Sequence, residues 1–252
     1  MSNETSVGLA PDDIQRIDNV LADGRVPDLT RRKLLQRAAV TAAAAGSLTL
    51  GSVGPAFASS DDVATVVNTA VTAEALAVTY LTGVIENLGT ARPIKPFVPV
   101  LRAANAAEHD HLKALKSLGA KPLTTKFWAP DSFFEPKNVF PTIEVAETLF
   151  VNAYLIGISV FTDAGKDDYA RYAGEILGTE AEHRTLARFA QGKLPNNVGF
   201  EDYSITSMSG IVSALEDAGV GFGKRGKKPG KFYAYREPPA RALGTVSGDS
   251  PA

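Results

Sequence analysis

Four segments of this chain carry apolar residues at alternating intervals of three and four, and ionisable side chains interrupt each of these stripes. Such spacing is typical of one buried face of an α-helix. The interrupting residue is a glutamate in all four segments, and a histidine follows it three residues later in the second and the fourth. The six interrupting residues are Glu74, Glu108, His111, Glu147, Glu180 and His183. The sequence therefore predicts a helical core that contains six ionisable groups.

The two Glu-x-x-His pairs are informative because the chain has only three histidines. Residues i and i+3 of a helix lie on one face with Cβ atoms about 5–6 Å apart, so each pair can present a carboxylate and an imidazole to one ion. His109 precedes His111 by two residues and should therefore face away from the stripe. We expect His109 to be a surface residue.

A short motif, A-E-x-L-x-V, occurs upstream of each pair, at residues 73–78 and 146–151. The distance along the chain is 34 residues from Glu74 to Glu108 and 33 from Glu147 to Glu180. Two similar motifs at nearly equal spacing predict an internal repeat of two helix pairs.

The buried acids need a partner, because an unpaired carboxylate in the core costs several kcal/mol. No lysine or arginine occupies the four stripes. Two divalent cations would balance four glutamates and leave both histidines neutral as nitrogen donors. The alternative is a set of protonated or water-linked core carboxylates. We favour a dinuclear site for iron or manganese, both of which accept oxygen and nitrogen ligands.

Several neighbouring residues have open roles. Glu144, one turn before Glu147, is a candidate supporting group or alternative ligand. Tyr80 and Tyr154 either donate hydrogen bonds near the site or pack in the core. Three further acids fall off the stripes, and we expect them to be solvated: Glu86, Glu175 and Glu182.

The order of these residues on four successive helices is Glu, Glu-x-x-His, Glu and Glu-x-x-His. This order resembles that of the ferritin-like di-iron carboxylate superfamily. The chain is more narrowly similar to bacterial and plant ferritin-like domain proteins that include desiccation-related members. This similarity rests on Ala73-Glu74-x-Leu76 with Tyr80, and on Tyr154 after Glu147. The resemblance covers about residues 61–192. It implies an all-α fold, a ferritin-like antiparallel four-helix bundle made of two helix-pair repeats with a long crossover between the second and third helices.

The resemblance also implies a function. A dinuclear iron or manganese centre in this superfamily reacts with O₂ or peroxide, as in ferroxidases, peroxidases and catalases, with electrons from an external donor. The alternative is a non-enzymatic envelope or stress protein, related to desiccation, in which the metals are structural. Metal storage is a third possibility, but it would require a cage that the long tail disfavours. The fold alone does not select a reaction.

The helix ends are marked by capping and breaking residues. We expect the first helix to start at Ser60 with Asp61 and Asp62, and Pro99 to lie in the first turn of the second. The third should open at Thr142 and the fourth at Asp167 or Asp168. The helix-ending signals are Gly89, Gly119 and Gly192. The segment 119–141 has no sustained period and is long enough to serve as the crossover.

The first 58 residues match an export signal. The stretch Thr30–Leu35 contains the paired Arg31 and Arg32 of the twin-arginine consensus, and an apolar stretch follows it. Ala56 and Ala58 form an A-x-A cleavage site. We therefore expect the twin-arginine translocation machinery to be a partner and the protein to reach the periplasm, cell envelope or extracellular space. The alternative is a buried N-terminal helix.

The remaining chain divides into a bundle at residues 59–200 and a C-terminal extension at residues 201–252. The extension should contain a short helix over Ser207–Ala218, a flexible basic segment over Gly223–Lys231, and a disordered end from Glu237. The basic segment could bind an anionic surface, although its glycines and proline favour a simple solvated run.

Composition adds two limits. Residues 1–58 contain six basic and six acidic side chains, so the formal net charge of −2 is unchanged by their removal, and we expect no nucleic-acid partner. The absence of cysteine from the sequence excludes disulfides and iron–sulfur centres. An oligomer is possible.

Overall fold

The structure is a computed structural model that describes residues 61–246. The predicted signal residues Arg31, Arg32, Ala56 and Ala58 lie outside the described residues. The export signal and its cleavage site therefore stay predictions.

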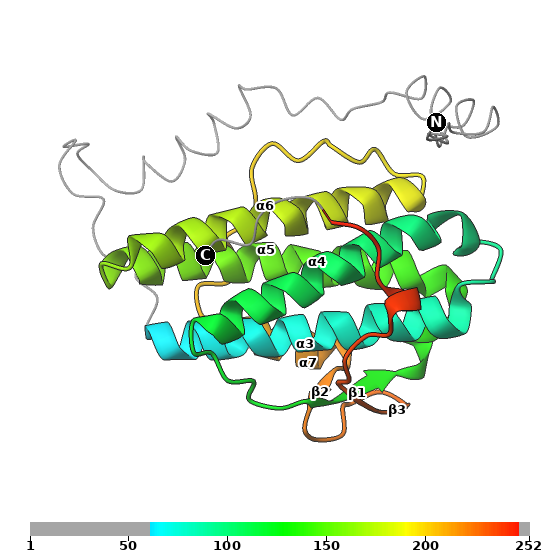
Figure 1. Cartoon of the computed structure of the whole chain (residues 1–252), viewed down its shortest axis with the longest axis horizontal. Coiled ribbons are helices and arrows are strands. Elements are labelled where there is room, and N and C mark those ends of the chain that lie inside the picture. The colour runs from blue at the N-terminus through cyan, green and yellow to red at the C-terminus, as the bar shows by residue number, and fades with distance from the viewer. Residues whose placement is uncertain (1–60, 247–252) are drawn as a thin grey trace, which may run out of the picture. The chain divides into compact units, whose positions relative to one another are not determined.

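Four long helices form the bundle (Figure 1). They are α3 (Val63–Leu88), α4 (Val98–Ser117), α5 (Val139–Asp163) and α6 (Asp167–Ala190). Helix α3 packs most extensively on α4, and α5 on α6, so each predicted helix pair is a packed unit. The chain crosses between α4 and α5 by a long segment, which confirms the predicted ferritin-like connectivity.

The helices begin where the sequence provides suitable first turns. The Asp62 side chain accepts a hydrogen bond from the Thr65 backbone N–H at 2.7 Å and caps α3. Helix α5 begins at Val139, three residues before the predicted Thr142. This start places Pro141 in the first turn of α5. Proline is tolerated there because the backbone nitrogens of a first helical turn have no acceptor within the helix. Asp167 and Asp168 lie in the first turn of α6, where negative charge is favourable.

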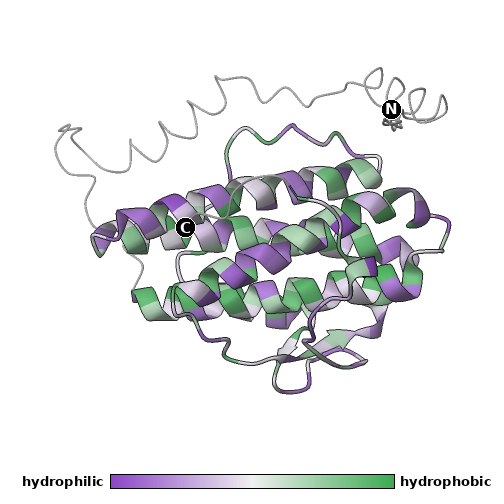
Figure 2. Ribbon diagram, in the orientation of Figure 1, coloured by the Kyte–Doolittle hydropathy of each residue, from purple (hydrophilic) through white to green (hydrophobic). Residues whose placement is uncertain are grey.

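Hydrophobic residues occur along much of α3 and α5, whereas α6 has many hydrophilic residues (Figure 2). In the described part of the chain, Val63–Leu88 and Pro136–Asp163 are long and apolar enough to cross a membrane. However, 67% and 56% of their most apolar stretches are buried inside the protein. Burial of this kind is what core helices of a bundle require.

The crossover contains a strand, β1 (Lys126–Pro130), and two 3₁₀ turns, η2 (Asp131–Phe134) and η3 (Pro136–Asn138). Strand β1 is the middle of an antiparallel sheet of order β2-β1-β3, with β2 at Gly221–Phe222 and β3 at Gly230–Ala234. Close strand approach requires Gly230, because a Cβ there would lie 2.2 Å from the Ala129 carbonyl oxygen.

The C-terminal extension begins with α7 (Met208–Ala218), where the sequence predicts a short helix. The segment Gly223–Lys231, for which the sequence predicts flexibility, connects β2 to β3 and includes the first two residues of β3. The sheet is held by aromatic contacts, with the Trp128 and Phe232 ring centroids 5.2 Å apart and those of Phe134 and Tyr233 4.8 Å apart.

The sequence predicts a disordered end from Glu237 onward, and residues 237–246 of this end belong to the described part of the chain. This segment crosses the α3 and α4 pair and contains the 3₁₀ turn η4 (Ala240–Ala242) (Figure 1). The buried Asn105 side chain donates a hydrogen bond to the Ala242 carbonyl at 2.9 Å. Glu86, expected to be solvated, forms ion pairs with Arg236 and Arg241. Polar contacts with helices far earlier in the sequence therefore order the chain end.

Candidate metal centre

The six predicted residues come together inside the bundle, one or two from each helix. Helices α3 and α5 each contribute one glutamate, and α4 and α6 each contribute a glutamate and a histidine. The contributed residues are Glu74, Glu108, His111, Glu147, Glu180 and His183. All six point into the core because they share the apolar face of their helices. Glu74, Glu108 and Glu180 are fully buried, at 0% exposure.

Glu108 and Glu180 lie between the two imidazole rings. The Nδ1 atom of His111 is 3.4 Å from Oε2 of Glu108 and 3.3 Å from Oε1 of Glu180. The Nδ1 atom of His183 is 2.8 Å from Oε1 of Glu108 and 3.3 Å from Oε2 of Glu180. Each of these two carboxylates therefore directs one oxygen to each histidine, which is the arrangement of bridging ligands between two ions.

The outer glutamates complete two overlapping groups. Glu74 lies on the His111 side, with its Oε2 3.8 Å from Nδ1, and Glu147 lies on the His183 side at the same distance through Oε1. In each group the candidate donor atoms lie within 4.8 Å of one another. Both groups share Glu108 and Glu180, so the cluster is consistent with a site for two metal ions.

The donor atoms do not satisfy one another. Within the described residues, neither oxygen of Glu108 or Glu180 makes a hydrogen bond, and neither do the Nδ1 atoms of His111 and His183. Nδ1 of His183 and Oε1 of Glu108 are only 2.8 Å apart, but their arrangement does not meet the geometry of a hydrogen bond. Buried polar atoms are nearly always paired. Lone pairs that converge without pairing fit a bound cation, and the residues present fit two.

Without metal, the cluster favours bound protons. Burial raises the pKa of Glu74 and Glu147, and the neighbouring carboxylates raise it further. Burial opposes ionisation of Glu108 as well, but its contacts with the two rings outweigh that effect and hold its pKa well below the usual range. Burial lowers the pKa of each ring, yet the carboxylates raise it more, to about 10 for His183 and well above the usual value for His111.

Tyr154 belongs to the site. Its hydroxyl donates a hydrogen bond to Oε1 of Glu74 across the bundle, from α5 to α3. This bond leaves Oε2 of Glu74 as the oxygen without a partner, directed to the His111 side. The sequence left Tyr154 open between a site role and core packing, and its contact assigns it the first.

Tyr80 and Glu144 lie outside the cluster. The Tyr80 hydroxyl donates to the Phe133 carbonyl at 2.9 Å, at the crossover. Glu144 accepts hydrogen bonds from Arg188 at 3.0 Å and from Gln191 at 2.7 Å. Neither residue is among the donor groups, so the structure gives Glu144 a salt-bridge role between α5 and α6.

His109 was expected at the surface, and this expectation is wrong. The residue is buried, with 7% exposure, and its Nε2 lies 2.6 Å from Oε2 of Glu237. His109 does face away from the cluster, as its spacing predicts, but the C-terminal segment covers that face. Burial by a segment 128 residues away leaves no signal in the local helical pattern.

Comparison with known proteins agrees with this fold and site. A family model described as a ferritin-like domain matches residues 61–193. The match covers more than half of the chain and includes all six donor residues, so the chain belongs to the ferritin-like domain family. No curated protein and no solved structure gives a significant match.

Proposed function

We propose that the cluster binds two iron or manganese ions and that the loaded protein carries out oxidative chemistry with O₂ or peroxide. The observation that supports this most directly is the pair of buried carboxylates, Glu108 and Glu180, each with one unpaired oxygen toward each histidine. Four glutamates balance two divalent charges, which removes the cost of burying them. Oxygen and imidazole donors suit both metals.

The residues have separate roles in this proposal. Glu108 and Glu180, which belong to both donor groups, would help to hold both ions, while Glu74 with His111 and Glu147 with His183 would each help to hold one. Bound ions of this kind supply Lewis acidity and one-electron redox chemistry. Tyr154 orients Glu74 through its hydrogen bond, and electrons for a catalytic cycle come from an external donor.

Metal analysis of the folded protein tests the site. We expect close to two iron or manganese ions per chain, and a loss of most of that metal in Glu108→Ala and Glu180→Ala. His109→Ala is the matched control, since it alters a buried histidine on α4 that lies outside the cluster. Equal metal content in all three variants would contradict the ligand assignment.

Reactivity tests the chemistry separately. The reduced iron-loaded or manganese-loaded protein should consume O₂ or decompose peroxide faster than the free ion at equal concentration. Glu147→Ala should slow this reaction, because it removes a donor from one ion only. A loaded protein that is inert to both oxidants, yet loses thermal stability when the metal is removed, would instead support a structural centre in a stress or envelope protein.

We also propose that the protein is exported by the twin-arginine machinery. The support is the Arg31-Arg32 pair, the apolar stretch and the A-x-A site that precedes residue 59. This pathway exports folded proteins. A metal site could therefore be loaded inside the cell, before the protein meets competing ions outside.

A further inference from the structure

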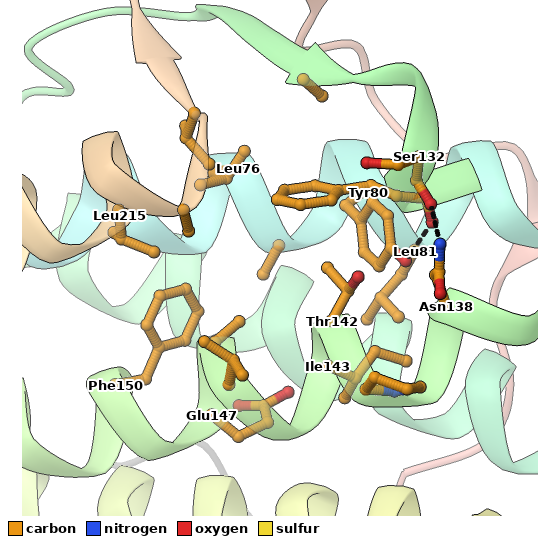
Figure 3. Close-up of a pocket in the computed structure, with 18 of the residues that line it drawn as sticks. Leu76, Tyr80, Leu81, Ser132, Asn138, Thr142, Ile143, Glu147, Phe150 and Leu215 are labelled. Carbon is orange, nitrogen blue, oxygen red and sulfur yellow. Dashed lines mark hydrogen bonds between the residues drawn. The ribbon is translucent and has the colours of Figure 1, made fainter. Parts of the chain in front are cut away.

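A cavity of about 330 Å³ lies between α3, α5, α7 and the crossover, and Glu147 lines it (Figure 3). Of the six donor residues, Glu147 is the one whose side chain reaches this cavity. Small-molecule sites in proteins typically measure roughly 300–1,000 Å³ and are lined mainly by apolar groups. The cavity has room for on the order of ten or more non-hydrogen atoms.

The lining is apolar over most of its area, with Phe150 and Ile143 beside Glu147, and Leu76 and Leu215 on the opposite side (Figure 3). Such a surface favours a ligand that loses little hydration on entry. Carboxylate, ammonium or phosphate groups would be costly to bury there.

Two polar side chains of the lining, Tyr80 and Asn138, are engaged within the protein. The Tyr80 hydroxyl donates to the Phe133 carbonyl, and Asn138 Nδ2 donates to the Ser132 carbonyl at 2.9 Å. These groups therefore do not require a ligand with matching polar atoms. Apart from Glu147, Lys228 is the one acidic or basic residue in the lining, and it is exposed.

The cavity opens at the surface of the protein. Val145 and Ala218 belong to the lining, and Val145 is 53% exposed, which is unusual for a large apolar residue. The cavity therefore extends from the surface at Val145 to the side chain of Glu147, one of the six donor residues of the cluster. On the other side of the cluster, the cavity beside Glu74 and Tyr154 measures only about 70 Å³.

We propose that this cavity binds an uncharged, largely apolar small molecule and holds it beside the Glu147 side of the metal centre. The proposal rests on the proposed function for the metal centre but can be tested without metal. It gives the site a substrate class, an apolar organic compound, and a route of entry that does not pass through the buried bridging carboxylates.

The first arm of the test measures binding to the metal-free protein. The probe is 2-naphthol, an uncharged fluorescent compound, compared with 2-naphthoate, which has nearly the same shape and a negative charge. We expect saturable binding of 2-naphthol and at least tenfold weaker binding of 2-naphthoate, because the carboxylate must lose its hydration. Equal or tighter binding of 2-naphthoate would overturn the proposed ligand class.

Two variants locate the binding site. Ala218→Phe fills the lining, and Val145→Trp covers the opening from an exposed position where a larger side chain does not disturb the core. Each should weaken 2-naphthol binding at least tenfold. Ala214→Phe is the matched control, because Ala214 is half-buried on the same helix and does not line the cavity. Undiminished binding in both cavity variants, with folding confirmed by circular dichroism, would overturn the proposal.

The second arm tests the position next to the metals. The protein is loaded with Co²⁺, whose visible absorption reports its ligand geometry, and 2-naphthol is added. A change in this spectrum that saturates with ligand binding supports placement beside Glu147, and an unchanged spectrum at full occupancy contradicts it. If Co²⁺ does not bind at all, the proposed metal function fails, while the metal-free measurements still decide whether the cavity binds the ligand.

Discussion

Removing the metal should make the stability of this protein depend strongly on pH in the alkaline range. The reason is the proton that His183 holds in the metal-free cluster, where its pKa is about 10 instead of the usual 6.5. As the pH rises above 6.5, the unfolded chain loses this proton while the folded protein keeps it. The folded state then binds more protons than the unfolded state, so stability falls as the pH rises.

The size of the stability change follows from the interval between the pKa of His183 in the unfolded chain and its pKa in the folded, metal-free protein. One pH unit between the two pKa values changes the free energy of unfolding by about 1.36 kcal/mol for each such group. From pH 7 to pH 9, His183 alone should therefore reduce stability by about 2.7 kcal/mol. For a domain of this size, that reduction corresponds to a decrease of about 5–10 °C in Tm. Raised pKa values at Glu74 and Glu147 act in the same direction from pH 4.5 upward.

Metal should abolish this dependence. A metal-bound imidazole has no proton to lose at its donor nitrogen, so the loaded protein should show little change in Tm between pH 7 and pH 9. The assay is thermal and urea unfolding of the chelated and loaded forms across this range, followed by circular dichroism. In the chelated form His183→Gln should lose the part of the pH dependence that His183 contributes, while His111, whose pKa is also raised, keeps its own part.

Glu144→Gln is the control, because it alters a carboxyl group of α5 that pairs with Arg188 outside the cluster. It should keep the pH dependence of the chelated protein. A chelated wild-type protein whose Tm is constant from pH 7 to pH 9, or a loaded protein with the same slope as the chelated one, would refute this account of the cluster.

Three further perturbations test other parts of the structure. Tyr154→Phe leaves Oε1 of Glu74 without its donor, which should cost about 1–3 kcal/mol and lower metal affinity in competition with a chelator, whereas Tyr80→Phe should leave the affinity unchanged. Glu237→Gln should weaken the contact with His109 and lower stability by about 1 kcal/mol, with faster amide hydrogen exchange in residues 235–246; unchanged exchange would contradict the role of this contact. Arg31→Lys with Arg32→Lys should leave the precursor inside the cell although the charge is conserved, as seen by fractionation and immunoblotting, and normal export would argue for another route.

The bundle and the cluster were predictable because both depend on local patterns. Intervals of three and four place Glu108 and His111 on one helical face, and the same rule applies to Glu180 and His183. Once the four faces are known to be apolar, they must pack against one another, which brings their ionisable residues together. The sequence could therefore indicate the cluster without any knowledge of long-range contacts.

The sheet and the C-terminal segment were not predictable by the same reasoning. Strands of two to five residues have too few positions to show an alternating pattern, and β1 pairs with β3 about one hundred residues later. The burial of His109 likewise depends on Glu237, which is distant in the chain. Contacts of this kind are determined by tertiary packing. The basic residues around Lys227 favoured a solvated segment in the sequence interpretation, whereas the neighbouring strand is stabilised by contacts between aromatic side chains.

The repeat also explains why the two sides of the cluster differ. Tyr154 follows Glu147 by seven residues and reaches across to donate to Glu74. The residue seven positions after Glu74 is Leu81, which has no donor to offer to Glu147 and instead lines the cavity beside it. The half of the cluster with the tyrosine borders a cavity of only about 70 Å³, and the half with the leucine borders one of about 330 Å³. The similarity of the two halves thus explains the positions of the six candidate donors, and the difference at one position explains why the proposed ligand cavity lies on the Glu147 side.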